Sequence, residues 1–170
     1  MIFGLSTPLN DPAGGADAPW LDVVIEVPRF SFLKRGSNGR IDFVSPLPCP
    51  FNYGSVPARL GLEGDLLDAL VLGPRLALGT RLQVRAWGAV TLRDRGMIDD
   101  KLVCSATPVD ERERARVLRF FAVYARCKAV LNLARRRPGR NACEGWIDAR
   151  AALARARPRS DDWRGPDVEF

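Results

Sequence analysis

The chain has 170 residues and 46% hydrophobic side chains, enough for one folded domain with or without a short tail, which excludes disorder and a disulfide-held miniprotein. No apolar run approaches the roughly 20 residues that a membrane span needs. It contains no histidine, which excludes a Ser-His-Asp triad, a Cys-His pair and any His-bearing zinc site. The net charge of +6 arises entirely after Ala106, partly from an Arg-rich stretch at 135–140.

Residues 1–20 are rich in Gly, Pro, Ala and Asp and predict an irregular N-terminal arm. They have neither a basic segment nor the apolar segment of a signal peptide, so we expect a cytoplasmic protein. The 4 cysteines are far apart and form no CxxC pair, and in a cytoplasmic protein we expect them to be reduced.

Short segments with β-branched or aromatic residues and partial alternation follow the arm, separated by Gly and Pro. They predict strands at 21–27, 30–34, 40–44, 68–73, 81–93 and 101–106. Several short strands in about 85 residues favour a small barrel over alternating strands and helices.

A long helix is predicted after the last strand, with Thr107 as its N-cap and Pro108 in the first helical position. Val117, Phe121, Tyr124 and Leu131 recur on one face of it, so this helix should pack on the barrel. A shorter helix is predicted over 147–157. The expected fold is therefore mainly β with flanking helices (α+β): a small barrel packed by one long and one short C-terminal helix, and a polar tail at 158–170.

Acidic residues gather in two segments. Glu63, Asp65 and Asp68 surround Gly64 before a strand, and Asp94, Asp99 and Asp100 surround Gly96 beside Lys101. Either segment alone could be an ordinary solvated turn. Together they hold 6 of the 11 acids before Thr107, and several carboxylates converging on one point are what hard divalent cations bind. A site for several metal ions is therefore plausible.

Lysine and tyrosine are scarce. The 26 basic residues include only three lysines, Lys34, Lys101 and Lys128, and the only tyrosines are Tyr53 and Tyr124. A lysine kept where arginine carries nearly all the positive charge suggests a need for a compact point charge, as in phosphate binding. A phenol kept where Phe would fill the same space suggests a use for its hydroxyl.

Six segments in chain order together resemble the family I soluble inorganic pyrophosphatases. They are VVIEVP (23–28), PFNYG (50–54), EGDLLDALV (63–71), the D-x4-D-x-K of 94–101, RFFAVY (119–124) and EGW (144–146). The similarity runs from about residue 21 to 157. The EGDLLD element resembles the D-G-D-P-x-D signature of the family.

The resemblance implies a five-stranded OB-like barrel, several Mg²⁺ ions and hydrolysis of diphosphate to two phosphates by an activated water. It also implies that Asp65 is the general base and that two groups of residues bind the metal ions and the substrate. The metal ligands would be Glu63, Asp68 and Asp99, with Asp94 for further ions and Glu26 at the edge; Lys34, Tyr53, Lys101 and Tyr124 would contact the phosphates. The unit with this activity would span 21–157, and bacterial members of the family imply a homo-oligomer.

The sequence also departs from the family pattern. Glu63 stands where the family usually has Asp, Gly36 where a metal-site Glu is common, and Cys49 where Tyr is common. Ala125 replaces a usual Lys, although Arg126 is adjacent. Arg40 or Arg35 is the candidate replacement for the phosphate-binding Arg of the family.

Two alternatives follow. One is a divergent member with weak activity or another phosphoanhydride substrate. The other is an OB-type nucleic-acid binder that uses the basic stretch Arg135–Arg140. The second is disfavoured, because no aromatic residues are interleaved with these arginines and the acidic segments would repel phosphate without metal ions. We expect no membrane partner.

Overall fold

The computed structural model describes residues 18–35, 41–44, 47–134, 136 and 139–165, and for 33–35 and 41–44 it describes the backbone alone. Arg40 and Gly36 and most of the predicted arm lie outside this range. The strands and helices, in chain order, are β1 (Trp20–Val27), β2 (Leu33–Arg35), β3 (Ile41–Val44), β4 (Asn52–Leu60), β5 (Leu66–Val71), β6 (Arg81–Asp94), β7 (Met97–Ser105), α1 (Glu111–Ala134), β8 (Ala142–Ile147), α2 (Ala149–Arg155) and β9 (Arg157–Pro158).

Five strands close into a ring. The order β1–β4–β5–β7–β6 is completed by pairing of β6 with β1, and all these pairs are antiparallel except β5 with β7. The predicted five-stranded barrel with two C-terminal helices is therefore confirmed. Strand β8 adds to the free side of β6, and β2 and β3 form a separate hairpin.

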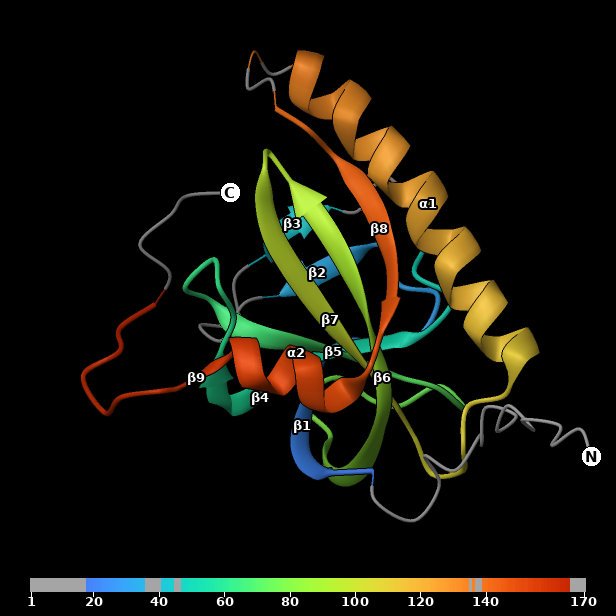
Figure 1. The fold of residues 1–170 in the computed structure, drawn as a ribbon, viewed down its shortest axis with the longest axis vertical. Coiled ribbons are helices and arrows are strands. Elements are labelled where there is room, and N and C mark those ends of the chain that lie inside the picture. Colours follow the sequence, from blue (N-terminus) through green and yellow to red (C-terminus); the bar gives the residue numbers. More distant parts are fainter. Residues whose placement is uncertain (1–17, 36–40, 45–46, 135, 137–138, 166–170) are drawn as a thin grey trace, which may run out of the picture.

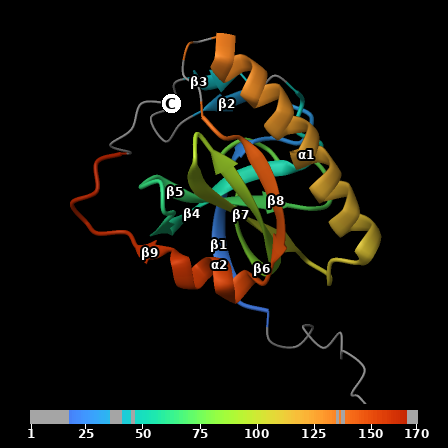
Figure 2. The ribbon, with the colours of Figure 1, turned by 45° about the horizontal axis from the view of Figure 1, so that its top comes forward.

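Helix α1 lies along one side of the ring against β8 and β6, and α2 lies against β6 and β7 (Figures 1 and 2). Val117 and Phe121 on α1 are buried against a cluster that includes Leu70, Val90 and Val103. The predicted apolar face of this helix is thus confirmed for Val117, Phe121 and Tyr124. A second cluster fills the side that faces α2. No helix in the described part of the chain is both long and apolar enough to cross a membrane.

The start of α1 differs from the prediction. The helix begins at Glu111, and Thr107 and Pro108 precede it as irregular chain. The Glu113 amide donates to Asp110 Oδ1 at 2.7 Å, and the Asp110 amide donates to Glu113 Oε2 at 3.4 Å. This reciprocal capping box satisfies two helix-end donors, which the single hydroxyl of Thr107 could not do, so Asp110 is the N-cap.

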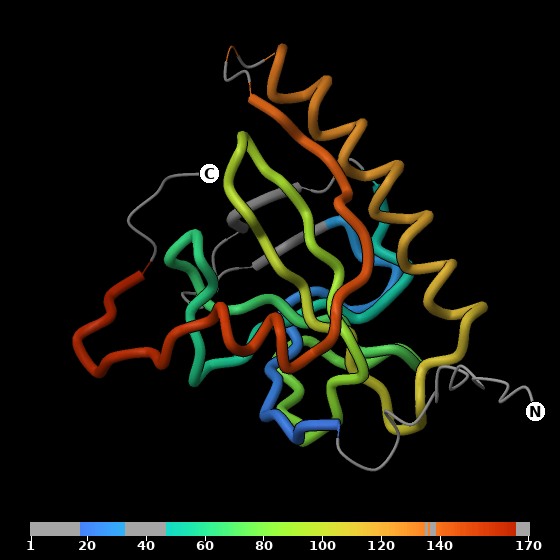
Figure 3. The backbone as a smooth tube through the Cα atoms, in the orientation of Figure 1, coloured from blue at the N-terminus to red at the C-terminus, as the bar shows by residue number. Residues whose placement is uncertain are grey.

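Strands β6 and β7 form a long hairpin that extends beyond the ring beside β8 (Figure 3). Arg95 and Gly96 form its two-residue turn with φ angles of 49° and 91°, as a type I′ turn requires. Asp94, Asp99 and Lys101 lie on one face of the hairpin, because residues two apart on a strand share a face and Asp99 is paired with Leu92. The fold therefore places Asp94 and Asp99 of the second acidic segment on one surface together with Lys101, and Asp100 on the opposite one.

Candidate active site

Lys101 is the centre of the site. Its Nζ lies 2.5 Å from Asp68 Oδ2 and 2.9 Å from Asp99 Oδ2, so the carboxylates of the two acidic segments meet at one ammonium. The pairing of β5 with β7 sets Asp68 directly beside Lys101. The convergence predicted from the two acidic segments is therefore observed for these residues.

Tyr53 completes this contact. Its hydroxyl donates a hydrogen bond to Asp68 Oδ2 and accepts one from Lys101 Nζ at 2.9 Å. Burial, and then the charge of Asp68, raise the pKa of Tyr53 well above its usual value, so the phenol stays protonated. Burial alone would lower the pKa of Lys101, but Asp68 and Asp99 outweigh it and raise that pKa well above its ordinary value. Lys101 therefore stays charged.

Glu63 approaches the same group from the loop before β5. Burial, and then repulsion by Asp99, raise the pKa of its carboxyl to about 8. Its Oε2 is buried and has no hydrogen-bond partner in the part of the chain that the structure describes. The carboxylate lies over Gly61, where a Cβ atom would come within 2.3 Å of Glu63 Oε1. Gly61 thus provides the space that the Glu63 side chain occupies.

Glu26 lies beside this group, and Asp65 lies in the loop before β5 that also carries Glu63. Ser55 Oγ donates to Glu26 Oε1 at 2.6 Å, and Ser55 is paired with Asp68 across β4 and β5. Glu26 therefore lies next to the row that contains Asp68. Asp65 accepts the Leu66 amide through Oδ1 at 2.7 Å, and its carbonyl accepts the Gly61 amide at 2.8 Å, which fixes the loop.

Asp94 has a partner that the sequence did not indicate. Lys128 Nζ on α1 lies 2.6 Å from Asp94 Oδ2, and the buried Asn132 donates to Oδ1 at 3.5 Å. Asp94 and Asp99 are diagonal neighbours on the hairpin, a relation that places Cβ atoms roughly 7–8 Å apart. Asp94 therefore lies beside the Lys101 group but is held by the helix.

The other predicted substrate contacts are placed unevenly. Tyr124 packs on α1 beside Phe120 and Phe121. Arg126 is exposed on the same helix and has no hydrogen bond or ion pair to any described residue. For Lys34, only the backbone is described, in β2. Asp100, which the sequence placed in the acidic segment, instead faces α2. Its carboxylate accepts a hydrogen bond from Thr91 on β6 and forms an ion pair with Arg155 on α2.

The donor set fits a hard divalent cation. Glu63, Asp68 and Asp99 supply only oxygen ligands, and Glu63 Oε2 is buried without a hydrogen-bond partner among the described residues. The two carboxylates of Asp68 and Asp99 face the single positive charge of Lys101. Among the described residues, no three acidic or sulfur-bearing side chains are already arranged around one point as metal ligands. Lys101 Nζ lies at the point where the Asp68 and Asp99 carboxylates meet.

The fold and the site define a closed five-stranded barrel that carries carboxylates, a buried lysine and a tyrosine on one face. A family model for inorganic pyrophosphatase matches residues 23–152. The chain belongs to this family. It is 36% identical to the inorganic pyrophosphatase of Haemophilus influenzae over 108 residues, which are 59% of this chain and 60% of that protein.

Solved structures agree with this assignment. The inorganic pyrophosphatase of Thermus thermophilus superposes with a TM-score of 0.65 at 28% identity, over 88% of this chain and 92% of that chain. The enzyme of Neisseria gonorrhoeae gives a TM-score of 0.64 at 27% identity, over 83% of this chain and 89% of that chain. The resemblance carried by the six sequence segments is therefore confirmed at the level of family and fold.

Proposed function

We propose that this chain hydrolyses inorganic pyrophosphate to two phosphates with the help of Mg²⁺. Family membership supports the reaction. The observation that carries it in this chain is the meeting of Asp68 and Asp99, from two separate segments, at Lys101 Nζ. A row of carboxylates beside a fixed cation suits the binding of metal-neutralised phosphate groups.

Glu63, Asp68 and Asp99 would hold the metal ions, with Glu26 and Asp94 at the two edges of the group. Bound Mg²⁺ would neutralise the phosphates and lower the pKa of the attacking water. Asp65 would act as the general base that accepts the proton of that water. It belongs to the loop in which the Gly61 amide donates a hydrogen bond to the Asp65 carbonyl. Lys101 and Tyr53 would bind phosphate oxygens and stabilise the leaving phosphate as its charge develops.

The remaining contacts with the substrate would come from residues outside the Lys101 group. Lys34, Arg40, Tyr124 and Arg126 are the candidates for these contacts. We further propose a cytoplasmic homo-oligomer without nucleic-acid or membrane partners. The unit with this activity would be 21–157.

The test measures phosphate released from pyrophosphate with and without Mg²⁺. We expect turnover only with Mg²⁺ and a loss of about 100-fold or more in Asp65→Asn, because general-base catalysis contributes roughly 10²–10⁴-fold. Asp22→Asn is the matched control, since Asp22 is exposed on β1 and has no polar partner among the described residues. Turnover without metal, or equal rates in Asp65→Asn and Asp22→Asn, would refute the assignment.

A divergent substrate is the second candidate, because this chain has Cys49 and Ala125 at two positions where the family commonly has Tyr and Lys. Cys49 is buried and burial raises its pKa to about 11, so it is a neutral thiol, and Ala125 is buried and apolar. The same assay with tripolyphosphate and nucleoside triphosphates tests this. Faster hydrolysis of either than of pyrophosphate would favour the second candidate, whereas salt-sensitive oligonucleotide binding without turnover would favour the nucleic-acid alternative.

A further inference from the structure

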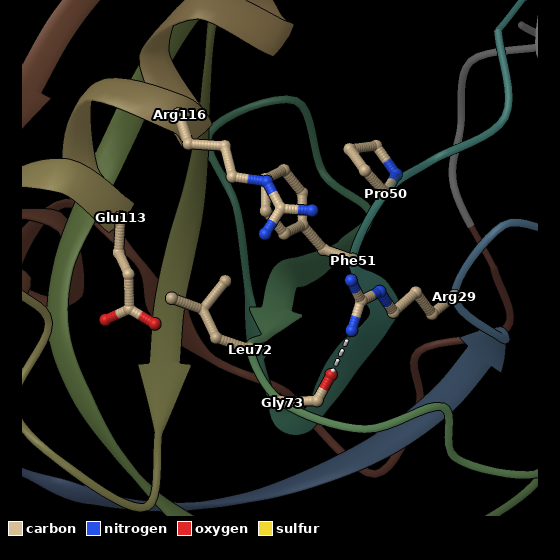
Figure 4. Close-up of a pocket in the computed structure, with 7 residues that line it drawn as sticks. All are labelled: Arg29, Pro50, Phe51, Leu72, Gly73, Glu113 and Arg116. Atoms are coloured by element: carbon tan, nitrogen blue, oxygen red, sulfur yellow. Dashed lines mark hydrogen bonds between the residues drawn. The ribbon is translucent and has the colours of Figure 1, made fainter.

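A second polar pocket lies away from the acidic site, between the first turns of α1 and the chain that follows β1 (Figure 4). Phe51, Leu72 and Gly73 form its floor, and Arg29, Arg116 and Glu113 surround it. Leu72 follows Asp68 by four residues along the same strand direction, which corresponds to roughly 13 Å. The pocket is therefore separate from the Lys101 group.

Arg29 is held rigidly at this pocket. Its amide donates to Asn52 Oδ1 at 3.1 Å, and its Nη1 donates to the Gly73 carbonyl at 2.9 Å. Asn52 is fully buried and also binds the carbonyls of Val71 and Pro74. The guanidinium is thus fixed in place before any ligand arrives, which reduces the entropy lost on binding.

At least one of the five N–H donors of this guanidinium is not used. Arg29 Nε is buried and has no hydrogen-bond partner among the described residues. A buried charged donor without an acceptor is costly, because the group has lost its water and gained nothing in return. An acceptor atom in the pocket would remove this cost.

Arg116 supplies a second guanidinium. It stacks on Phe51, with its Cζ 5.3 Å from the ring centroid, and Figure 4 shows it reaching over this ring from α1. Within the described residues, neither Arg29 nor Arg116 forms an ion pair with a carboxylate. Glu113 instead accepts a backbone hydrogen bond as part of the helix cap. Two guanidinium groups therefore share one small pocket with a single carboxylate, that of Glu113, and neither of them is paired with it.

We infer that this pocket binds a phosphate group, free or as the terminal group of a larger molecule. Guanidinium groups present paired donors that match the oxygens of phosphate. The volume of about 30 Å³ suits one small group. The site needs no metal ion, in contrast to the acidic site, and it does not depend on the proposed function.

The test measures binding of inorganic phosphate by calorimetry in EDTA. Without metal ions the acidic site carries excess negative charge and repels phosphate, so binding then reports the arginine pocket. We expect one site per chain in the wild-type protein and an affinity lowered about tenfold or more in Arg116→Gln. Arg116 is exposed, so this substitution should leave folding intact, which circular dichroism checks. Arg29→Gln should have the same effect.

Arg159→Gln is the matched control. It removes the same charge from an exposed residue beside Ala58, at the other end of β4. No phosphate binding by the wild-type protein, or equal weakening in Arg116→Gln and Arg159→Gln, would overturn the inference. Parallel titrations with AMP and adenosine identify the source of the group: tighter binding of AMP than of phosphate indicates a nucleotide, and equal binding indicates free phosphate. Binding of adenosine as tight as that of AMP would also overturn it.

Discussion

Replacing Lys101 by Met tests whether this ammonium holds the acidic site together. The side chain of Lys101 is 6% exposed and contacts Asp68, Asp99 and Tyr53. Methionine keeps the length and the apolar stem of the side chain but removes the charge. The substitution leaves two carboxylates facing each other, with Glu63 nearby and no compensating cation.

The expected loss is large, because a buried ion pair is broken on one side. Such a change costs roughly 3–5 kcal/mol of unfolding free energy. In a chain of this size each kcal/mol moves the melting temperature by about 2–4 °C, so we expect a decrease of roughly 6–20 °C in EDTA. The loss should shrink on acidification, since protonation of the bared carboxylates removes their repulsion.

The sign of the pH effect follows from Lys101 itself. Asp68 and Asp99 raise its pKa well above the ordinary value, so its stabilising charge is fully present at lower pH and is lost only at strongly alkaline pH. Between pH 5 and pH 8 the wild-type ammonium therefore does not titrate. A larger deficit of Lys101→Met at pH 8 than at pH 5 then reports the bared carboxylates.

Urea denaturation at pH 5 and pH 8 in EDTA measures both effects. Lys128→Met is the control, because it also removes an ammonium from a buried aspartate, but its side chain is 23% exposed and water can replace it. We expect a smaller loss there. A loss below about 1 kcal/mol in Lys101→Met, or a loss that is equal at both pH values, would refute the role given to Lys101.

Three further outcomes are expected. Burial raises the pKa of Glu63 from 4.5 to about 8, so the metal-free protein should lose stability as the pH rises through this window, and Glu63→Gln should flatten the slope in urea titrations; a slope equal to that of the wild type would contradict this. Gly61→Ala should displace the Glu63 carboxylate and reduce the rise in melting temperature that Mg²⁺ produces in the wild type; an unchanged Mg²⁺ response would contradict it. Burial raises the pKa values of Cys104 and Cys49 to about 12 and 11, so iodoacetamide should modify neither at pH 8 until urea unfolds the chain, as mass spectrometry can show.

The strands that the sequence failed to predict share a physical cause. Strand β4 contains Gly54 and Pro57, residues that weaken a strand pattern, yet its pairing with β5 is interrupted between Val56 and Leu60, where a proline is tolerated. Strand β8 contains Gly145 in a positive-φ conformation next to a register shift. In both strands irregular pairing accommodates the residues that argue against β structure.

Each of the two acidic segments could be predicted because its own members are close in sequence. Asp68 and Asp99 each belong to a short segment that follows a turn, and adjacent strands bring the two segments together. The contact of Asp94 with Lys128 depends instead on how α1 packs, 34 residues further along the chain, and no local spacing encodes it. The pocket with Arg29 and Arg116 was missed for the same reason.

The lysines show how composition and geometry support each other. Arginine supplies 23 of the 26 basic side chains, yet Lys101 and Lys128 are the residues that meet Asp68, Asp99 and Asp94. A guanidinium is planar and has donors directed outward in a fixed fork, whereas an ammonium can place one charge among oxygens that converge from several strands. Lys101 does this with three oxygen-bearing side chains in a space that is nearly closed to water. Two independent features of the sequence, the few lysines and the two acidic segments, therefore indicate the same surface of the protein.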